Sequence, residues 1–168
     1  MKPLLLVDGY NVIGAWREAV ERVWPLDECR DRLTAILQDF AGYTAQEVWL
    51  VFDGHKAERP QRSVETRAGV TVVYTRQGET ADQFIERKCH ELPRYREVRV
   101  ATSDGLEQTL VLGRGATRLS ARELWRELSH ERGKGKAHQK GARKGRGAIY
   151  EALTEEQRDR LERLRRQK

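Results

Sequence analysis

The stretch that decides the fold lies near the start of the chain, where residues 4–8 read Leu-Leu-Leu-Val-Asp. A short, continuous apolar run of this kind is typical of a β-strand that is covered on both faces. Further runs of similar character occur at residues 49–52, 70–74 and, more weakly, 98–101. The sequence therefore predicts four buried strands, the first of which ends in an aspartate.

Helical patterns separate these strands. Apolar residues recur at the helical spacing over residues 26–40 and 81–92, and the second run stops at Pro93. Thr80 and Gln83 have the spacing of a capping box, Ser120 is placed to cap a further helix, and a last helix is expected from about Thr154. Alternating strands and helices predict an α/β fold with a central, mostly parallel sheet and helices on both faces. The polar stretch 54–68 is expected to be a long loop.

The positive charge of the chain is concentrated in one segment. The 168 residues carry a net charge of +6, yet residues 1–131 hold 19 basic and 21 acidic side chains. Residues 132–147 hold seven basic side chains, five glycines and no acid, and they lack large apolar residues that could offset the entropy of ordering. We expect a folded domain over 1–131, a flexible basic linker over 132–147 that binds polyanions such as RNA, and a C-terminal helix over 148–168.

Several classes of protein are excluded by what the sequence lacks. No apolar run approaches the roughly 18 residues of a membrane span, and the apolar run at the start is too short for a signal peptide. Two cysteines cannot form a disulfide framework or a Cys-rich zinc site. Neither the dinucleotide nor the P-loop glycine motif occurs. These features predict a cytoplasmic protein without a membrane partner.

Acidic residues follow the predicted strands. Asp8, Asp53 and Asp104 come at or just after the ends of three predicted strands. Glu79 and Asp82 lie at the start of the helix that follows the remaining strand, at residues 70–74. The carboxyl ends of parallel strands meet at one edge of a sheet, which is where ligands bind in α/β folds. Carboxylates gathered there repel one another unless a cation neutralises them, and oxygen ligands suit Mg²⁺ or Mn²⁺. Each acid also has a structural reading, as a turn residue or, for Asp82, as a first-turn acid favoured by the helix dipole.

Four short motifs occur in a fixed order at these strand ends: Leu-Val-Asp8-Gly-Tyr-Asn11, Val-Phe-Asp53-Gly-His, Gly-Glu79-Thr-Ala-Asp82 and Ala-Thr-Ser103-Asp104. Together they resemble the NYN domain, a branch of the PIN-like nucleases, and within it the YacP group of ribosome-associated bacterial endoribonucleases. The resemblance spans about residues 1–131. It implies a PIN-like three-layer α/β fold and a metal-dependent endoribonuclease that cleaves messenger RNA on the translating ribosome, near the A site.

The resemblance also implies roles for individual residues. Asp8, Asp82 and Asp104 are the expected catalytic metal ligands for Mg²⁺ or Mn²⁺, and Asn11 is the expected positioning residue. Ser103 is placed to hydrogen-bond in the site, while Glu79 and Asp53 are further candidate site residues. A metal-activated water would attack the scissile phosphate in line and leave a 3′-hydroxyl and a 5′-phosphate.

Basic residues outside the acidic edge are expected to hold the RNA backbone. They are Arg59, Arg62 and Arg67 of the polar stretch and Lys134, Lys136, Lys140, Arg143, Lys144 and Arg146 of the basic segment. Tyr10, beside Asp8, is placed to stack on a base. Phosphate contacts fix position and carry no sequence information, so the choice of message or codon would come from elsewhere, such as the ribosome.

Two other functions are compatible with the same residues. The chain could be a non-catalytic RNA- or ribosome-binding module whose acidic edge is structural. It could also be a PIN-type toxin nuclease that acts on free tRNA or rRNA.

Overall fold

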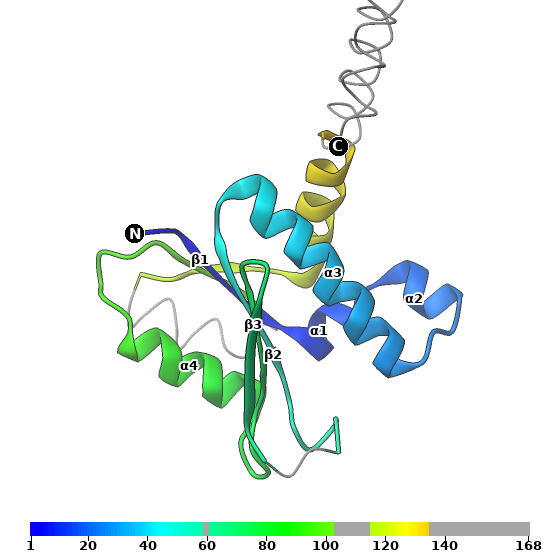
Figure 1. Ribbon diagram of the computed structural model, residues 1–168, viewed down its shortest axis with the longest axis horizontal. Helices are drawn as coiled ribbons and strands as arrows, with labels where there is room; N and C mark the ends of the chain where they lie inside the picture. The colour runs from blue at the N-terminus through cyan, green and yellow to red at the C-terminus, as the bar shows by residue number, and fades with distance from the viewer. Residues whose placement is uncertain (59–60, 103–114, 135–168) are drawn as a thin grey trace, which may run out of the picture. The chain divides into compact units, whose positions relative to one another are not determined.

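The first 131 residues contain a six-stranded sheet with helices on both faces (Figure 1). The computed structural model describes residues 1–58, 61–102 and 115–134. The chain divides into two units, Met1–Glu131 and Arg132–Lys168, and every described strand lies in the first. The elements in chain order are β1 (Leu4–Asp8), α1 (Gly9–Gly14), α2 (Arg17–Glu21), α3 (Leu26–Thr44), β2 (Glu47–Phe52), β3 (Ser63–Arg67), β4 (Val70–Tyr74), α4 (Ala81–Glu91), β5 (Val98–Ala101), β6 (Thr117–Leu119) and a helix that begins at residue 121 and is described as far as 134.

The strand order in the sheet is β3-β4-β2-β1-β5-β6. Every neighbouring pair is parallel except β3 and β4. The four strands predicted from apolar runs are β1, β2, β4 and β5, so the predicted fold class is confirmed. The predicted helix from about Thr154, and the basic segment from residue 135 onward, lie outside the described residues.

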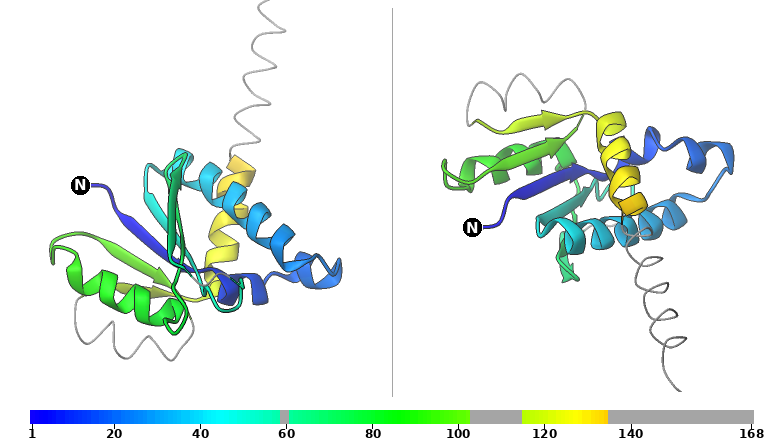
Figure 2. Two further views of the ribbon diagram at one scale, coloured as in Figure 1. Left: turned by 60° about the horizontal axis from the view of Figure 1, so that its bottom comes forward. Right: turned by 90° about the horizontal axis from the view of Figure 1, so that it is seen from above.

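Two hydrophobic clusters cover the two faces of the sheet. In β1, Leu5 and Val7 contact the cluster that includes α1, α3 and the helix from 121, whereas Leu4 and Leu6 contact the cluster built on α4. All four side chains are fully buried, as expected for a central parallel strand. Figure 2 shows α4 on the opposite side of the sheet from α3 and the helix from 121. No helix within the described ranges is long and apolar enough to cross a membrane.

The prediction of one long loop over 54–68 is wrong for residues 63–67. These residues form β3, which pairs antiparallel with β4 at the edge of the sheet. Ala68 and Gly69 join the two strands and both have positive φ, the geometry of a tight type I′ hairpin turn. Every residue of β3 is exposed, so the strand has no buried face that would produce an apolar pattern.

Helix caps follow the local sequence as predicted. Thr80 and Gln83 form a reciprocal capping box at the start of α4. Ser120 and Glu123 form the same arrangement at the helix from 121. Each box satisfies backbone N–H groups that the first turn of a helix leaves free. The caps therefore fix where these two helices leave the carboxyl edge of the sheet.

The turn from β1 into α1 requires a glycine at position 9. A Cβ atom added there would lie 2.3 Å from a ring carbon of Phe52, far inside van der Waals contact. Phe52 is fully buried at the end of β2 and stacks on Tyr74 with ring centroids 5.4 Å apart, so it has little room to move. This close approach sets the position of Asp8, the residue before the glycine.

We predict that Gly9→Ala lowers the free energy of unfolding by about 2–3 kcal/mol, because the added methyl group overpacks the Phe52 ring. Urea denaturation followed by circular dichroism measures the change. Gly14→Ala is the matched control, since nothing lies within 4 Å of a Cβ at that position of the same helix. The control should stay within about 1 kcal/mol of the parent, and equal losses in the two variants would contradict the close-approach argument.

Candidate active site

Asp8 lies where β1 ends and α1 begins. It is the N-cap of α1, and its Oδ1 accepts a hydrogen bond from the backbone N–H of Asn11 at 3.4 Å. The cap and the requirement for Gly9 hold the Asp8 carboxyl group at the carboxyl edge of the sheet, partly buried. Asn11 contacts Asp8 through its backbone N–H, and the role of Asn11 as a positioning residue stays a prediction.

Asp82 reaches the same place from the other face of the sheet. It lies in the first turn of α4, and its Oδ1 accepts a hydrogen bond from the hydroxyl of Thr102 at 3.3 Å. Thr102 is almost fully buried directly after β5. The charge of Asp82 acts on Asp8, so the two carboxyl groups lie close to each other. Elements β1, α4 and β5 therefore bring two carboxyl groups and one hydroxyl group together.

Contact between the two acids changes the chemistry of Asp8. Burial, and next the negative charge of Asp82, raise the pKa of Asp8 from 3.8 to about 6, while the backbone hydrogen bond from Asn11 and the charge of Lys56 act in the opposite direction. Two carboxylates in contact cannot both ionise easily without a counter-charge. The available donors are all oxygens, a set that fits Mg²⁺ or Mn²⁺.

The third predicted metal ligand cannot be placed. Asp104 and Ser103 lie outside the described residues, which resume at 115. Within the described ranges, no group of three or more His, Cys, Asp or Glu side chains is arranged to hold a metal ion. The described part of the site is therefore the Asp8–Asp82 pair with Thr102.

Glu79 does not join this pair in the way its spacing from Asp82 suggested. It precedes the N-cap Thr80, outside α4, and its carboxylate forms ion pairs with Arg62, at 2.6 Å, and with Arg87. Burial opposes ionisation of Glu79, but hydrogen bonds from the two arginines outweigh it and lower its pKa. The charge of the candidate site residue Glu79 is therefore neutralised by two arginines. One of them is Arg62, which was predicted to bind RNA.

Asp53 has the structural role of a turn residue. Its Oδ1 accepts hydrogen bonds from the backbone N–H groups of His55, at 2.9 Å, and Lys56, at 3.4 Å. Such a turn is a common use of aspartate after a strand. Lys56 was not predicted from the sequence, yet its charge acts on Asp8 and its ammonium lies 5.8 Å from the centre of the Tyr10 ring. A single lysine in a polar loop belongs to no sequence pattern, so its proximity to Asp8 could not be predicted.

Tyr10 is tied into the fold. Its ring packs tilted against Phe52 with centroids 5.1 Å apart, and its hydroxyl accepts a hydrogen bond from Arg30 at 3.1 Å. The side chain is partly buried. These contacts hold the ring against the core, so the predicted stacking of Tyr10 on a base would use only the part that stays exposed.

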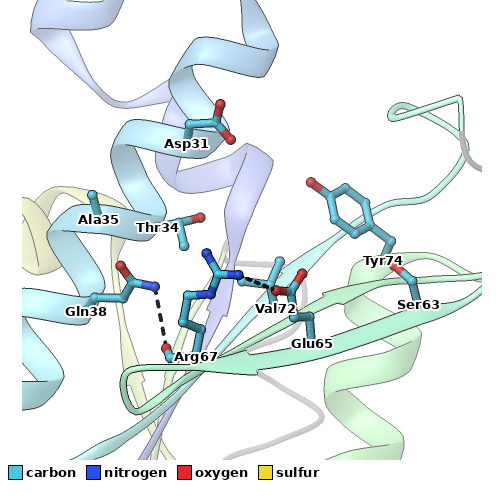
Figure 3. Close-up of a pocket in the computed structure, with 9 residues that line it drawn as sticks. All are labelled: Asp31, Thr34, Ala35, Gln38, Ser63, Glu65, Arg67, Val72 and Tyr74. Atoms are coloured by element: carbon cyan, nitrogen blue, oxygen red, sulfur yellow. Dashed lines mark hydrogen bonds and ion pairs between the residues drawn. The ribbon is translucent and has the colours of Figure 1, made fainter.

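Arg67, the third basic residue predicted from the 54–68 stretch, lines a cavity of about 360 Å³ between α3 and the β3–β4 hairpin (Figure 3). Its guanidinium lies 3.3 Å from the carboxylate of Glu65, and Gln38 donates a hydrogen bond to its carbonyl oxygen. Asp31 lines the same cavity. Two acids beside one arginine make this cavity a poor place for a phosphate.

Of the remaining residues predicted to bind RNA, most lie outside the described part of the chain. Lys134 is exposed at the last described position of the helix from 121. The others lie outside the described residues; they are Arg59, Lys136, Lys140, Arg143, Lys144 and Arg146.

Comparison with known proteins gives one consistent result. The sequence profile of the YacP-like NYN domain matches residues 5–166. The YacP protein of Bacillus subtilis is 40% identical over 127 residues, which cover 74% of this chain and 74% of that protein. The crystal structure of Rae1 (YacP) from Bacillus subtilis matches with a TM-score of 0.72 at 36% identity, over 97% of this chain and 94% of that one. A crystal structure of a single-substitution mutant of Rae1 matches with a TM-score of 0.71 at 31% identity, over 96% and 99% of the two chains.

The raised pKa of Asp8 predicts a stability effect in metal-free buffer. The folded state holds this proton more tightly than the unfolded state, so stability falls as the pH rises from about 4 to about 6, and the full cost is present above that range. Asp8→Asn removes the cost and keeps an N-cap side chain, so it should stabilise the protein by about 1–3 kcal/mol at about pH 8.

Urea denaturation in chelator measures this difference, which should shrink towards zero at about pH 4. Asp39→Asn, an exposed change on α3, is the matched control and should show no such dependence. A variant Asp8→Asn that is no more stable than the parent at the higher pH would contradict the strained carboxyl pair.

Proposed function

The chain belongs to the YacP-like NYN domain family, which is part of the PIN-like nuclease superfamily, and from this premise we propose that it is a metal-dependent endoribonuclease. One observation carries the proposal most directly. Asp8 and Asp82 lie together at the carboxyl edge of the sheet, where burial and the charge of Asp82 raise the pKa of Asp8 to about 6. A structural role alone does not require two acids in contact, because such a pair is destabilising without a cation.

Asp8 and Asp82 would hold the divalent cation, and Asp104, two residues after Thr102 in the sequence, is the proposed third ligand. When bound, Mg²⁺ or Mn²⁺ supplies a water of lowered pKa and positive charge that stabilises the oxygens of an in-line phosphoryl displacement. No protein nucleophile is needed for this chemistry.

The protein's own groups set the geometry. The Asn11 N–H orients the carboxyl group of Asp8, and the Thr102 hydroxyl orients that of Asp82. Preorganised ligands of this kind avoid reorganisation during the reaction. Lys56, whose charge acts on Asp8, adds a cation on the side of the turn that follows β2. We propose that Lys56 contacts a phosphate of the RNA next to the scissile one.

The proposed substrate is messenger RNA engaged on the ribosome, near the A site, with the basic segment 132–147 as the proposed ribosome contact. Support for this partner comes from the family resemblance and from the sequence of that segment, which has seven basic side chains and no acid. Such a segment binds ribosomal RNA through release of counterions. Sequence preference would then come from the position of the message on the ribosome, since phosphate contacts carry none.

We predict that Asp8→Asn and Asp82→Asn each reduce RNA cleavage by about 100-fold or more, because each removes a charged ligand from a preorganised site. Gel analysis of end-labelled RNA, free and ribosome-engaged, with Mg²⁺, Mn²⁺ or chelator, measures the rate. Asp39→Asn should cleave as the parent does. Parent-like cleavage by both site variants would refute the metal mechanism, and cleavage of free tRNA or rRNA in preference to ribosome-engaged message would favour a toxin nuclease.

We predict that replacing the seven basic residues of 132–147 by Gln or Ser abolishes association with ribosomes and weakens its salt dependence, because the counterion-release contribution is lost. Cosedimentation with ribosomes at several salt concentrations measures the binding. The thermal unfolding midpoint of the variant serves as the control and should equal that of the parent. Undiminished cosedimentation would show that another surface makes the contact.

A further inference from the structure

A basic groove with an aromatic floor lies between the α1–α2 junction and the helix from 121. Its volume is about 900 Å³, within the range of ligand sites in proteins. Residues 15–18 form one wall, and Arg122, Trp125, Arg126 and His130 belong to the other. All of these residues are in the first unit of the chain.

Two tryptophans lie at the floor, of which Trp16 is buried and Trp125 is half-buried. The indoles of Trp16 and Trp125 stack with centroids 4.6 Å apart and planes inclined by 27°. The Trp125 indole N–H donates a hydrogen bond to the Val12 carbonyl oxygen at 2.9 Å. Because that donor is already used inside the protein, what Trp125 offers to the groove is ring surface. The floor is thus a fixed aromatic surface with an apolar character.

The walls carry an excess of positive charge. Arg17, Arg122 and Arg126 line the groove and are exposed, and Arg17 pairs with Glu21 at 2.7 Å. Glu18 is the acid among the lining residues. Glu18 already pairs with Arg22 at 3.4 Å. In the described part of the chain, the ion pairs include neither Arg122 nor Arg126. The groove is therefore a cationic surface on a unit with more acidic than basic residues.

The groove begins beside the acidic edge of the sheet. Val12, which accepts the Trp125 hydrogen bond, lies four residues beyond Asp8, a rise of about 6 Å along α1. The helix from 121 follows β6, which runs parallel to β5 and so ends at the same edge as β1. Figure 2 shows this helix beside α1. A strand of nucleic acid that reaches Asp8 could therefore continue along α1 into the groove.

We propose that this groove binds a single-stranded segment of RNA, with phosphates at Arg122 and Arg126 and a base or ribose against the exposed part of the Trp125 ring. Cationic walls with stacked aromatic rings are the arrangement by which proteins hold single strands, whose bases are free to contact a ring. A duplex hides its bases, so the aromatic floor would add nothing to its binding. The choice of RNA rests on the proposed function, while the binding itself needs neither metal nor cleavage.

The test measures binding of a fluorescent single-stranded oligoribonucleotide to the full chain in chelator, by anisotropy at several salt concentrations. Arg122→Gln/Arg126→Gln should weaken binding about 10-fold and reduce the slope of log affinity against log salt by about 1.4, since each contact to a single strand contributes about 0.7. Lys2→Gln/Arg94→Gln is the matched control: it removes the same charge from exposed positions before β1 and between α4 and β5, at the opposite edge of the sheet. A duplex of the same length is the second probe.

The proposal predicts a loss confined to the groove variant and larger for the single strand than for the duplex. Equal losses of affinity in the groove variant and the control variant would show an effect of net charge alone and would overturn the proposal. Equal losses of affinity for the single strand and the duplex would overturn the role of the aromatic floor. Unchanged affinity in the groove variant would leave the groove to a protein partner. Because no metal is present, these outcomes are independent of whether the parent protein cleaves RNA.

Discussion

The contact between the carboxyl groups of Asp8 and Asp82 is the constraint on which the site depends. The two acids come from opposite faces of the sheet, so only the packed sheet can bring them together. Fully buried β1 side chains fix the strand, Gly9 allows the turn against Phe52, and the Thr80–Gln83 box fixes the start of α4. Burial of the hydrophobic core contributes many kcal/mol to stability, so the fold can tolerate the few kcal/mol that the Asp8–Asp82 pair costs.

The division of charge along the chain follows from the same constraint. An acidic edge repels a polyanion until a cation neutralises it, so the affinity for RNA must come from other surfaces. The chain carries its basic residues elsewhere, in the segment 132–147 and along the groove that contains Arg122 and Arg126.

The sequence was informative where the cause is local. A buried parallel strand must be apolar along its whole length, and a helix cap depends on residues close in sequence. For these reasons β1, β2, β4, the Thr80–Gln83 box and the cap at Ser120 could be predicted. The exposed strand β3 has no such pattern. The pairing of Glu79 with Arg62, 17 residues earlier, could not be predicted from the sequence. The same holds for the groove, because Trp125 and its acceptor Val12 are 113 residues apart. Contacts between distant segments depend on the packed fold and leave no periodicity.

The contacts of Glu79 and Asp53 bear on how many charges the site can hold. Five carboxylates around one divalent cation would leave a net charge of about −3, which would repel a phosphodiester. The fold removes Glu79 by pairing it with two arginines, and it gives Asp53 the backbone N–H groups of its own turn. The remaining carboxylates are Asp8, Asp82 and the proposed third ligand Asp104. Their total negative charge is close to the amount that one divalent cation can neutralise. A site reduced in this way can admit the anionic backbone that five free carboxylates would exclude.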